Sequence, residues 1–234
     1  PELAVNHKVD RELWCGSYVT TYLERDIRNL AAIGDLNQFE RFVKLCATRT
    51  GQILNLTEMA RDIGIAVSTA RRWISILEAG YQVFLLYPYY KNIGKRLIKS
   101  PKLYFADTAL ASYLLGLHSK EVLLASPSFG HLFETAVIVD VLKRFHNFGQ
   151  RPSMYYLRTR DGLEVDLAIE SFNGLYLFEI KTSMTVTLKH ASSLKMLKSS
   201  LSTRIKGAAI ISPSAGSGYL TQEVRHLDYR DALK

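Results

Sequence analysis

The chain has 234 residues, of which 47% are hydrophobic and 22% charged, enough to bury the core of one large domain or two small ones. No run of about 18 apolar residues occurs, so we expect no transmembrane helix, and no signal peptide opens the sequence. The formal net charge of +8 at pH 7 favours anionic partners. Because the chain begins at Pro1 without an initiator Met, we expect a fragment of a longer, cytoplasmic protein. The two cysteines, Cys15 and Cys46, lie in apolar segments, where we expect buried, inert thiols rather than a disulfide or a zinc site.

Apolar residues recur at helical spacing through the N-terminal half of the chain. They predict helices that cover about residues 12–33, 36–48, 57–63, 68–80 and 107–117. Ser68 is the expected N-cap of the fourth helix, which stops at Gly80. Two apolar, aromatic segments at 81–87 and 97–105 follow it and predict a pair of strands.

The pattern changes after residues 125–128, the best candidate for a linker. A predicted helix at about 129–145 precedes three strand-like segments, and the hairpin dipeptides Asp161-Gly162 and Asn173-Gly174 separate these. The later elements are strands at 154–159, 163–170 and 175–181, a helix near 188–200, and strands near 208–211 and 223–227. This order predicts an α/β fold, with a helical domain at 1–120 and a mixed sheet flanked by helices at 121–234.

The two short helices on either side of Gly64 have the spacing of a helix-turn-helix. In that motif the first turns of the second helix enter the major groove of DNA. Seven basic residues against Glu78 and Asp107 give the stretch 68–107 a net charge of +5: Arg71, Arg72, Lys91, Lys95, Arg96, Lys99 and Lys102. We therefore expect a face that contacts nucleic acid, formed by Ser68, Thr69, Arg71, Arg72, Lys91, Lys95 and Arg96. Protein docking or spacing between domains is the alternative, and the apolar Trp73, Ile74 and Leu77 are expected in the core.

Acidic side chains recur in the predicted strands. Strict alternation places Leu163, Val165, Leu167 and Ile169 on one face of the second strand, and Glu164, Asp166 and Glu170 on the other. Glu179 and Lys181 share a face of the next strand, which the Asn173-Gly174 turn makes an antiparallel neighbour. This arrangement allows Asp166 to lie close to Glu179.

A third carboxylate, Glu134, stands in helical register with Ile138, Val141 and Phe145, so we expect it to point inward. Burying an unpaired charge costs several kcal/mol, so it needs a partner, and a divalent cation is one. Oxygen ligands suit Mg²⁺ or Mn²⁺. The hypothesis is a metal site of Glu134, Asp166 and Glu179.

In this hypothesis Asp166, Glu179 and Lys181 are the catalytic residues, and Lys181 orients the attacking water or neutralises charge on the phosphorane. Arg158 and Arg160, on the neighbouring strand, are candidate contacts to the phosphate backbone. The alternative is an ordinary surface salt bridge between strands, which contributes little.

Three segments resemble the PD-(D/E)XK nucleases: 129–134 (Phe-Gly-His-Leu-Phe-Glu), 156–166 and 178–183 (Phe-Glu-Ile-Lys-Thr-Ser). Together with residues 22–27, 49–55 and 99–108, they make most of 14–190 resemble the C-terminal portion of prokaryotic AAA-type ATPases that carry a DUF4143 region. The resemblance implies a winged helix followed by a restriction-endonuclease-like domain. It also implies site positions at Glu134, Asp166, Glu179 and Lys181.

The chain contains no G-x-x-x-x-G-K-[ST] phosphate loop, so we expect no ATP site in it. The implied partners are DNA and a missing N-terminal ATPase domain of the same polypeptide, with no membrane involved and the oligomeric state open. The leading hypothesis is a DNA-binding module joined to a domain that cleaves a phosphodiester with Mg²⁺ or Mn²⁺. The alternative is a non-catalytic module, binding nucleic acid or protein, that regulates the ATPase.

Overall fold

A computed structural model describes residues 6, 9–22, 35–89, 100–158, 163–200, 204–214 and 216–232. The described part is a mixed α/β fold, as expected, with two sheets. Its N-terminal unit comprises α2 (Arg11–Thr21), α4 (Leu36–Thr48), β1 (Gln52–Ile53), α5 (Leu56–Ile63), α6 (Val67–Ala79), β2 (Val83–Leu86), β3 (Lys102–Phe105), α7 (Thr108–Leu114) and α8 (Lys120–Ala125). Its C-terminal unit comprises α9 (Phe129–Asn147), β4 (Ser153–Arg158), β5 (Glu164–Ser171), β6 (Gly174–Ile180), η3 (Leu188–Ala191), α10 (Ser192–Ser200), β7 (Ile205–Ser212), β8 (Gly218–Tyr219), β9 (Arg225–Asp228) and α11 (Tyr229–Ala232).

Elements with a long, regular pattern are found where the sequence predicts them, and α4 has the predicted bounds. The sequence misses β1, α8, β8 and α11, which have two to six residues each and are too short to show a period. The predicted helix at 12–33 is described only as far as residue 22, and the rest lies outside the described residues. No helix in the described part is long and apolar enough to cross a membrane.

The helices α5 and α6 are joined by Gly64, which adopts a left-handed conformation with φ of 80° and so allows the sharp turn between them. The N-cap of α5 is Asn55, whose side chain accepts a hydrogen bond from the backbone of Glu58. The prediction that Ser68 caps α6 is wrong, because the cap residue is Ala66 and Ser68 lies exposed in the first turn. The buried Trp73, Ile74 and Leu77 confirm the predicted core face of α6.

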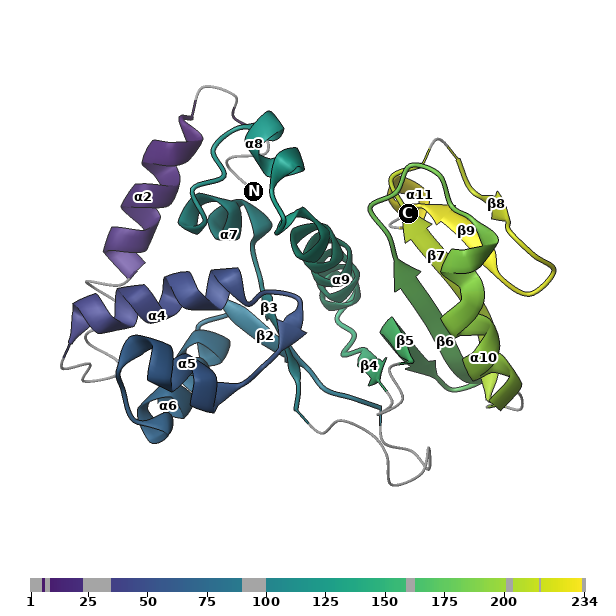
Figure 1. Cartoon of the computed structure of the whole chain (residues 1–234), viewed down its shortest axis with the longest axis horizontal. Helices are drawn as coiled ribbons and strands as arrows, with labels where there is room; N and C mark the ends of the chain where they lie inside the picture. Colours follow the sequence, from purple (N-terminus) through teal and green to yellow (C-terminus); the bar gives the residue numbers. More distant parts are fainter. Residues whose placement is uncertain are drawn as a thin grey trace.

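The small sheet has the order β1-β3-β2, is antiparallel, and is covered on both faces. Leu103 and Phe105 of β3 point into the N-terminal core, which also contains Phe42 and Trp73. Tyr104, between them, points the other way and packs with residues of α9 and the large sheet. Both units therefore pack against β3, one on each of its faces. The helix α9 lies between the N-terminal helices and the large sheet (Figure 1).

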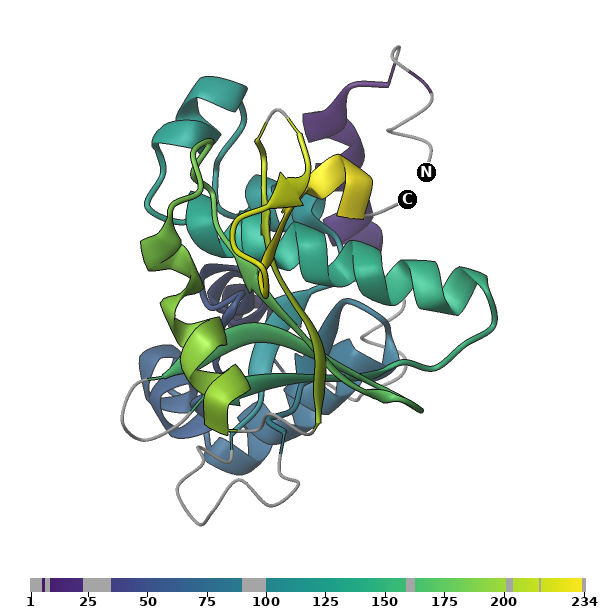
Figure 2. The same cartoon turned by 90° about the vertical axis from the view of Figure 1, so that its right-hand side faces the viewer.

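The large sheet has the order β4-β5-β6-β7-β9-β8 and is mixed, since β6, β7 and β9 run parallel while the remaining pairs are antiparallel. One face packs against α9 through Val137 and Ile138. The other face packs against α10 through Leu194 and Leu197. Figure 2 shows α10, in light green, across this outer face.

The register of β4 against β5 shifts between Tyr155 and Leu157, because one extra residue of β5 is inserted there. The predicted alternation along β5 is therefore wrong: Val165 packs on the α10 side, whereas Leu167 packs on the α9 side. Such β-bulges re-aim side chains and are common beside functional sites. Here the bulge contains Asp166, the central residue of the candidate site.

Hydrogen bonds at Tyr156 and at Thr50 link the two units. The backbone of Tyr156 on β4 accepts from Tyr89 N and donates to Tyr87 O, so the chain after β2 pairs with the large sheet. The hydroxyl of Thr50 accepts from the backbone N–H of Phe105 at 3.0 Å and lies 3.0 Å from the hydroxyl of Thr135 on α9. These contacts fix α9 relative to β3, and both elements carry site residues.

Candidate functional site

Four carboxylates and two lysines gather where β3, α9, β5 and β6 meet, and we call them the carboxylate cluster. They are Lys102, Glu134, Glu164, Asp166, Glu179 and Lys181. All four residues predicted for the nuclease site belong to it. Lys102 and Glu164 were not among the predicted site residues.

Lys102 is the cation at the centre of the carboxylate cluster and is only 3% exposed. Its Nζ lies 2.7 Å from Glu164 Oε1, 3.1 Å from Glu134 Oε1 and 3.8 Å from Asp166 Oδ1. Burial works against the charged form, but the nearby Glu134, Asp166 and Glu164 hold the pKa of Lys102 above its usual range. Lys102 was counted in the basic stretch 68–107, but it is not available to phosphates, because its ammonium group is buried among carboxylates.

Glu134 points inward from α9, as its register with Ile138 predicted. Its Oε1 accepts hydrogen bonds from the hydroxyl of Tyr104 at 2.6 Å and from Lys102 Nζ at 3.1 Å. Lys102 and Tyr104 are two residues apart on β3 and so share a face. The partner that the inward carboxylate requires is thus supplied by the N-terminal unit.

Asp166 is 8% exposed and lies in the bulge of β5. Its Oδ2 accepts a hydrogen bond from the backbone N–H of Ile180 at 2.8 Å, which places the carboxylate beside the end of β6. Burial, and then the charge of Glu134, raise the pKa of Asp166, while Lys102 opposes the shift. Asp166 therefore carries its negative charge at an energetic cost that a further cation would relieve.

Glu179 is 7% exposed, and its two oxygens have different surroundings. Oε1 lies 2.6 Å from Lys181 Nζ, whereas Oε2 is buried and has no hydrogen-bond partner. Burial and the charge of Asp166 raise the pKa of Glu179, while Lys181 opposes the shift. A buried carboxylate oxygen without a partner is rare, and an ion is one explanation for it.

The carboxylate cluster has an excess of negative charge, since four carboxylates face two ammonium groups. Arg158 pairs with Glu164 at 3.4 Å from the half-exposed rim. Asp166 and Glu179, with the unpartnered Oε2, fit a hard divalent cation. No group of three or more His, Cys, Asp or Glu side chains is already arranged to hold a metal ion in the part of the chain that the structure describes.

The predicted nucleic-acid contacts on α6 do not belong to the carboxylate cluster, whereas Arg158 lies at its rim. Ser68, Arg71 and Arg72 are exposed on α6 and Thr69 is half-buried there, and among the described residues neither arginine forms an ion pair. Four of the predicted contacts lie outside the described residues: Lys91, Lys95, Arg96 and Arg160. The predicted face is therefore described only on α6 and at Arg158.

One signal in the sequence could have identified Lys102 as a site residue. It is the first residue of the segment Lys-Leu-Tyr-Phe, in which three consecutive apolar residues predict a strand that is buried on both faces. A lysine in such a strand requires a buried carboxylate partner. Its partners Glu134 and Glu164 follow it by many residues, so spacing alone could not name them.

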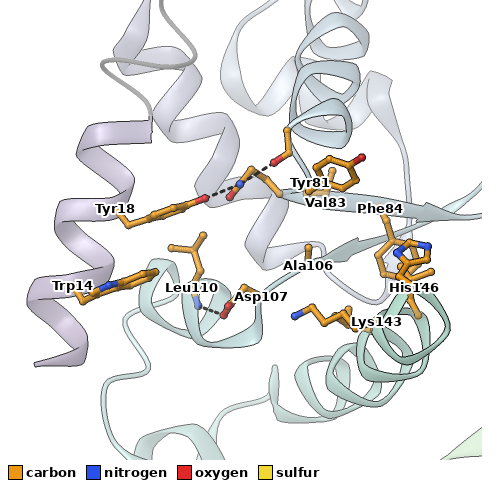
Figure 3. Close-up of a pocket in the computed structure, with 14 residues that line it drawn as sticks. Trp14, Tyr18, Tyr81, Val83, Phe84, Ala106, Asp107, Leu110, Lys143 and His146 are labelled. Atoms are coloured by element: carbon orange, nitrogen blue, oxygen red, sulfur yellow. Dashed lines mark hydrogen bonds between the residues drawn. The ribbon is translucent and has the colours of Figure 1, made fainter. Parts of the chain in front are cut away.

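A cavity of about 410 Å³ in the described part of the chain is separate from the carboxylate cluster. Trp14 and Tyr18 line it from α2, and Lys143 and His146 line it from α9 (Figure 3). The Asp107 carboxylate at its edge already accepts hydrogen bonds from the first turn of α7, and none of its lining residues belongs to the carboxylate cluster. This cavity shares no residue with the buried carboxylates, and we place the candidate site at the carboxylate cluster.

Two family models match the chain. Residues 1–121, more than half of the chain, match the family described as "Domain of unknown function (DUF8612)". The chain belongs to this family. Residues 129–227 match the family described as "Domain of unknown function (DUF4143)", which confirms that part of the resemblance and confines it to the C-terminal unit.

The chain is 32% identical over 191 residues to an uncharacterized protein of Mycobacterium bovis and to one of Mycobacterium tuberculosis. The matched region is 82% of this chain and 42% of each relative. The chain therefore spans less than half the length of these curated relatives. No solved structure matches it.

Proposed function

We propose that the carboxylate cluster is the active site of a nuclease of the PD-(D/E)XK type, which hydrolyses phosphodiester bonds in DNA with Mg²⁺ or Mn²⁺. The observation that carries this proposal is the buried Glu179 Oε2, which has no hydrogen-bond partner and lies beside a second buried carboxylate, Asp166. Two such groups repel each other unless a cation or protons neutralise them.

The order of elements supports the proposal. In the C-terminal unit a helix, a three-stranded antiparallel meander, a helix and a parallel strand follow one another, as the resemblance to these nucleases implies. The order α4-β1-α5-α6-β2-β3 accords with a winged helix. These likenesses concern architecture, and the chemistry depends on the site itself.

Each residue of the site has a distinct task in this proposal. Asp166 and Glu179 would hold the cation, which polarises the scissile phosphate and lowers the pKa of a water. Lys181, about one third exposed and 2.6 Å from Glu179 Oε1, can reach a phosphate at the rim and donate to its developing charge. Burial lowers the pKa of Lys181, but Glu179, Asp166 and Glu134 together raise it above its usual value, so Lys181 acts as a cation rather than as a base.

The exposed face of α6 would bind the DNA backbone. Arg71 and Arg72 are exposed and form no ion pair within the described part of the chain, so they are free to contact phosphates. We further propose that the natural partner is an AAA-type ATPase domain of the same polypeptide in the cytoplasm, since the curated relatives are more than twice as long as the part that matches.

Cleavage of DNA tests the proposal directly. The protein is incubated with plasmid, linear duplex, single-stranded and branched DNA in the presence of Mg²⁺ or Mn²⁺. Wild type should cut at least one substrate, Lys181→Ala should lose most of the activity, and the exposed Lys195→Ala should keep it. Equal cutting by Lys181→Ala, or no cutting by the wild type, contradicts the proposal.

A second candidate is a non-catalytic module that binds nucleic acid or protein and regulates the ATPase. One observation favours it: Glu134, expected to bind metal, is already paired with Lys102 and Tyr104. This candidate predicts DNA binding that weakens steeply with salt, without turnover. Binding that is insensitive to salt would instead point to protein docking.

A further inference from the structure

Lys102 is a residue of the N-terminal unit that lies inside the site of the C-terminal unit. It is carried by β3, whereas its three carboxylate partners are carried by α9 and β5. The ring of Tyr156 on β4 completes its surroundings, with the ammonium group 5.6 Å from the ring centroid. A lysine so completely buried needs these carboxylates to stabilise its charge, and it stabilises their charges in the same way.

The partners of Lys102 divide the four carboxylates into two groups. Glu164 has both oxygens paired, Oε1 with Lys102 and Oε2 with Arg158. Glu134 Oε1 accepts from both Lys102 and Tyr104. Asp166 Oδ1, by contrast, lies 3.8 Å from Lys102 Nζ, beyond hydrogen-bond distance, and no ion pair among the described residues joins Lys102 to Glu179.

The net charge of the carboxylate cluster also indicates one bound cation. Arg158 pairs with Glu164 from the solvent, where water screens its charge. The four carboxylates and two ammonium groups of the carboxylate cluster itself leave two negative charges, which one divalent cation neutralises. A second divalent cation would leave the cluster with two positive charges in a poorly solvated place. Without Lys102 three negative charges would remain, and Glu134 would lose its ammonium partner and favour a second cation.

We propose that Lys102 is a built-in cation of the carboxylate cluster, which engages Glu134 and Glu164 and so restricts the site to one divalent cation, held by Asp166 and Glu179. This inference rests on the proposed function, because it states how many divalent cations that site binds and which residues hold them. It also makes the specificity of the C-terminal site depend on a residue of the N-terminal unit. Glu134 then becomes a residue that positions Lys102 instead of a ligand.

Manganese binding without DNA tests the inference, by calorimetry and by the electron paramagnetic resonance signal of free Mn²⁺. Wild type should bind one Mn²⁺ per chain. Glu179→Gln should weaken binding by about 100-fold or more, as expected for a lost ligand. Glu134→Gln should keep one ion and weaken its binding by about tenfold at most, the long-range effect of one lost charge.

Lys102→Met should bind two Mn²⁺ per chain instead of one, while the exposed Lys44→Met, which removes an equal charge elsewhere, should bind one. Should Lys102→Met fail to fold, Glu134→Gln still decides the matter, since its Gln keeps the shape of the side chain. Two ions on the wild type, or a loss in Glu134→Gln as large as that in Glu179→Gln, overturns the inference.

The outcomes also separate the inference from the proposed function. One bound Mn²⁺ with no cleavage of any DNA leaves the inference standing and removes the nuclease proposal. Two bound ions with cleavage do the reverse. A wild-type protein that binds no Mn²⁺ overturns both.

Discussion

Lys102 and the pair Arg71 and Arg72 belong to one basic stretch of the sequence, yet they lie in opposite surroundings. Lys102 is buried among three carboxylates, while the two arginines are exposed on α6 without an ion pair in the described part of the chain. A buried charge without a partner costs several kcal/mol, whereas an exposed one has almost no effect on stability. The difference teaches that a run of basic residues is not one surface, and that only its exposed members are available to an anionic partner.

The largest expected effect comes from removing the buried cation. Lys102→Met should lower the free energy of unfolding by about 3–5 kcal/mol at mildly alkaline pH, because Glu134, Glu164 and Asp166 lose their shared partner. Chemical denaturation measures it. The control is Lys44→Met, whose exposed pair with Glu40 contributes about 0.5 kcal/mol or less. A similar, small loss in both variants would show that burial makes no difference here.

The pH dependence of stability is the next largest effect. Burial raises the pKa values of Asp166 and Glu179 from ordinary values of 3.8 and 4.5 to about 7, with the charge of Glu134 adding to the shift of Asp166 and the charge of Asp166 adding to that of Glu179. The folded state therefore binds more protons than the unfolded state between these values. The stability that these raised pKa values contribute is complete below about pH 4 and is lost as the pH rises through about 7.

Thermal unfolding across this pH range tests whether stability falls as the pH rises. Wild type should become less stable from acidic to neutral pH, and Mg²⁺ or Mn²⁺ should restore stability above neutrality by binding the ionised pair. Glu179→Gln should show a flatter profile, since it has one carboxyl fewer to ionise. A wild-type profile that rises over the same range would mean that the two carboxylates are already well compensated.

A smaller effect should separate a buried from an exposed threonine. Thr50→Val removes the acceptor of the buried Phe105 N–H and should lower the free energy of unfolding by about 1–3 kcal/mol. The control Thr48→Val removes an exposed hydroxyl that donates to Leu45 O, and should change stability by about 0.5 kcal/mol or less. Equal effects in denaturant unfolding would argue against Thr50 as a link between the two units.

Local spacing predicted much of the candidate site. The helical register of Glu134 with Ile138 predicted its inward direction, and the hairpin at Asn173-Gly174 made β5 and β6 neighbours. The role of Lys102 was not predictable in this way, because its partners lie on elements that follow it by 32 residues or more. In the sequence Lys102 is one of seven basic residues in the stretch 68–107, and only the packing of β3 against α9 shows that it is buried.

The bulge in β5 was hidden for a different reason. Strict alternation from Leu163 to Ile169 is compatible with a regular strand, and the extra residue shows only in the pairing with β4. The bulge directs Val165 and Leu167 to opposite faces. The sequence thus predicts which carboxylates lie close together. The direction in which each one points depends on the register of β5 against β4, which residue spacing does not determine.

The smallest expected effect on stability belongs to the exposed arginines. Arg71→Ala and Arg72→Ala should each change the free energy of unfolding by about 0.5 kcal/mol or less, since neither forms an ion pair in the described part of the chain. Each should nevertheless weaken DNA binding and reduce the slope of log affinity against log salt by about 1 per lost phosphate contact. Titration of labelled duplex DNA at several salt concentrations measures this, with the exposed Arg61→Ala on α5 as the control. If Arg71→Ala and Arg72→Ala have the same slope as wild type and the control, α6 does not contact DNA. The buried Lys102 and the exposed arginines would then differ only in their effect on stability.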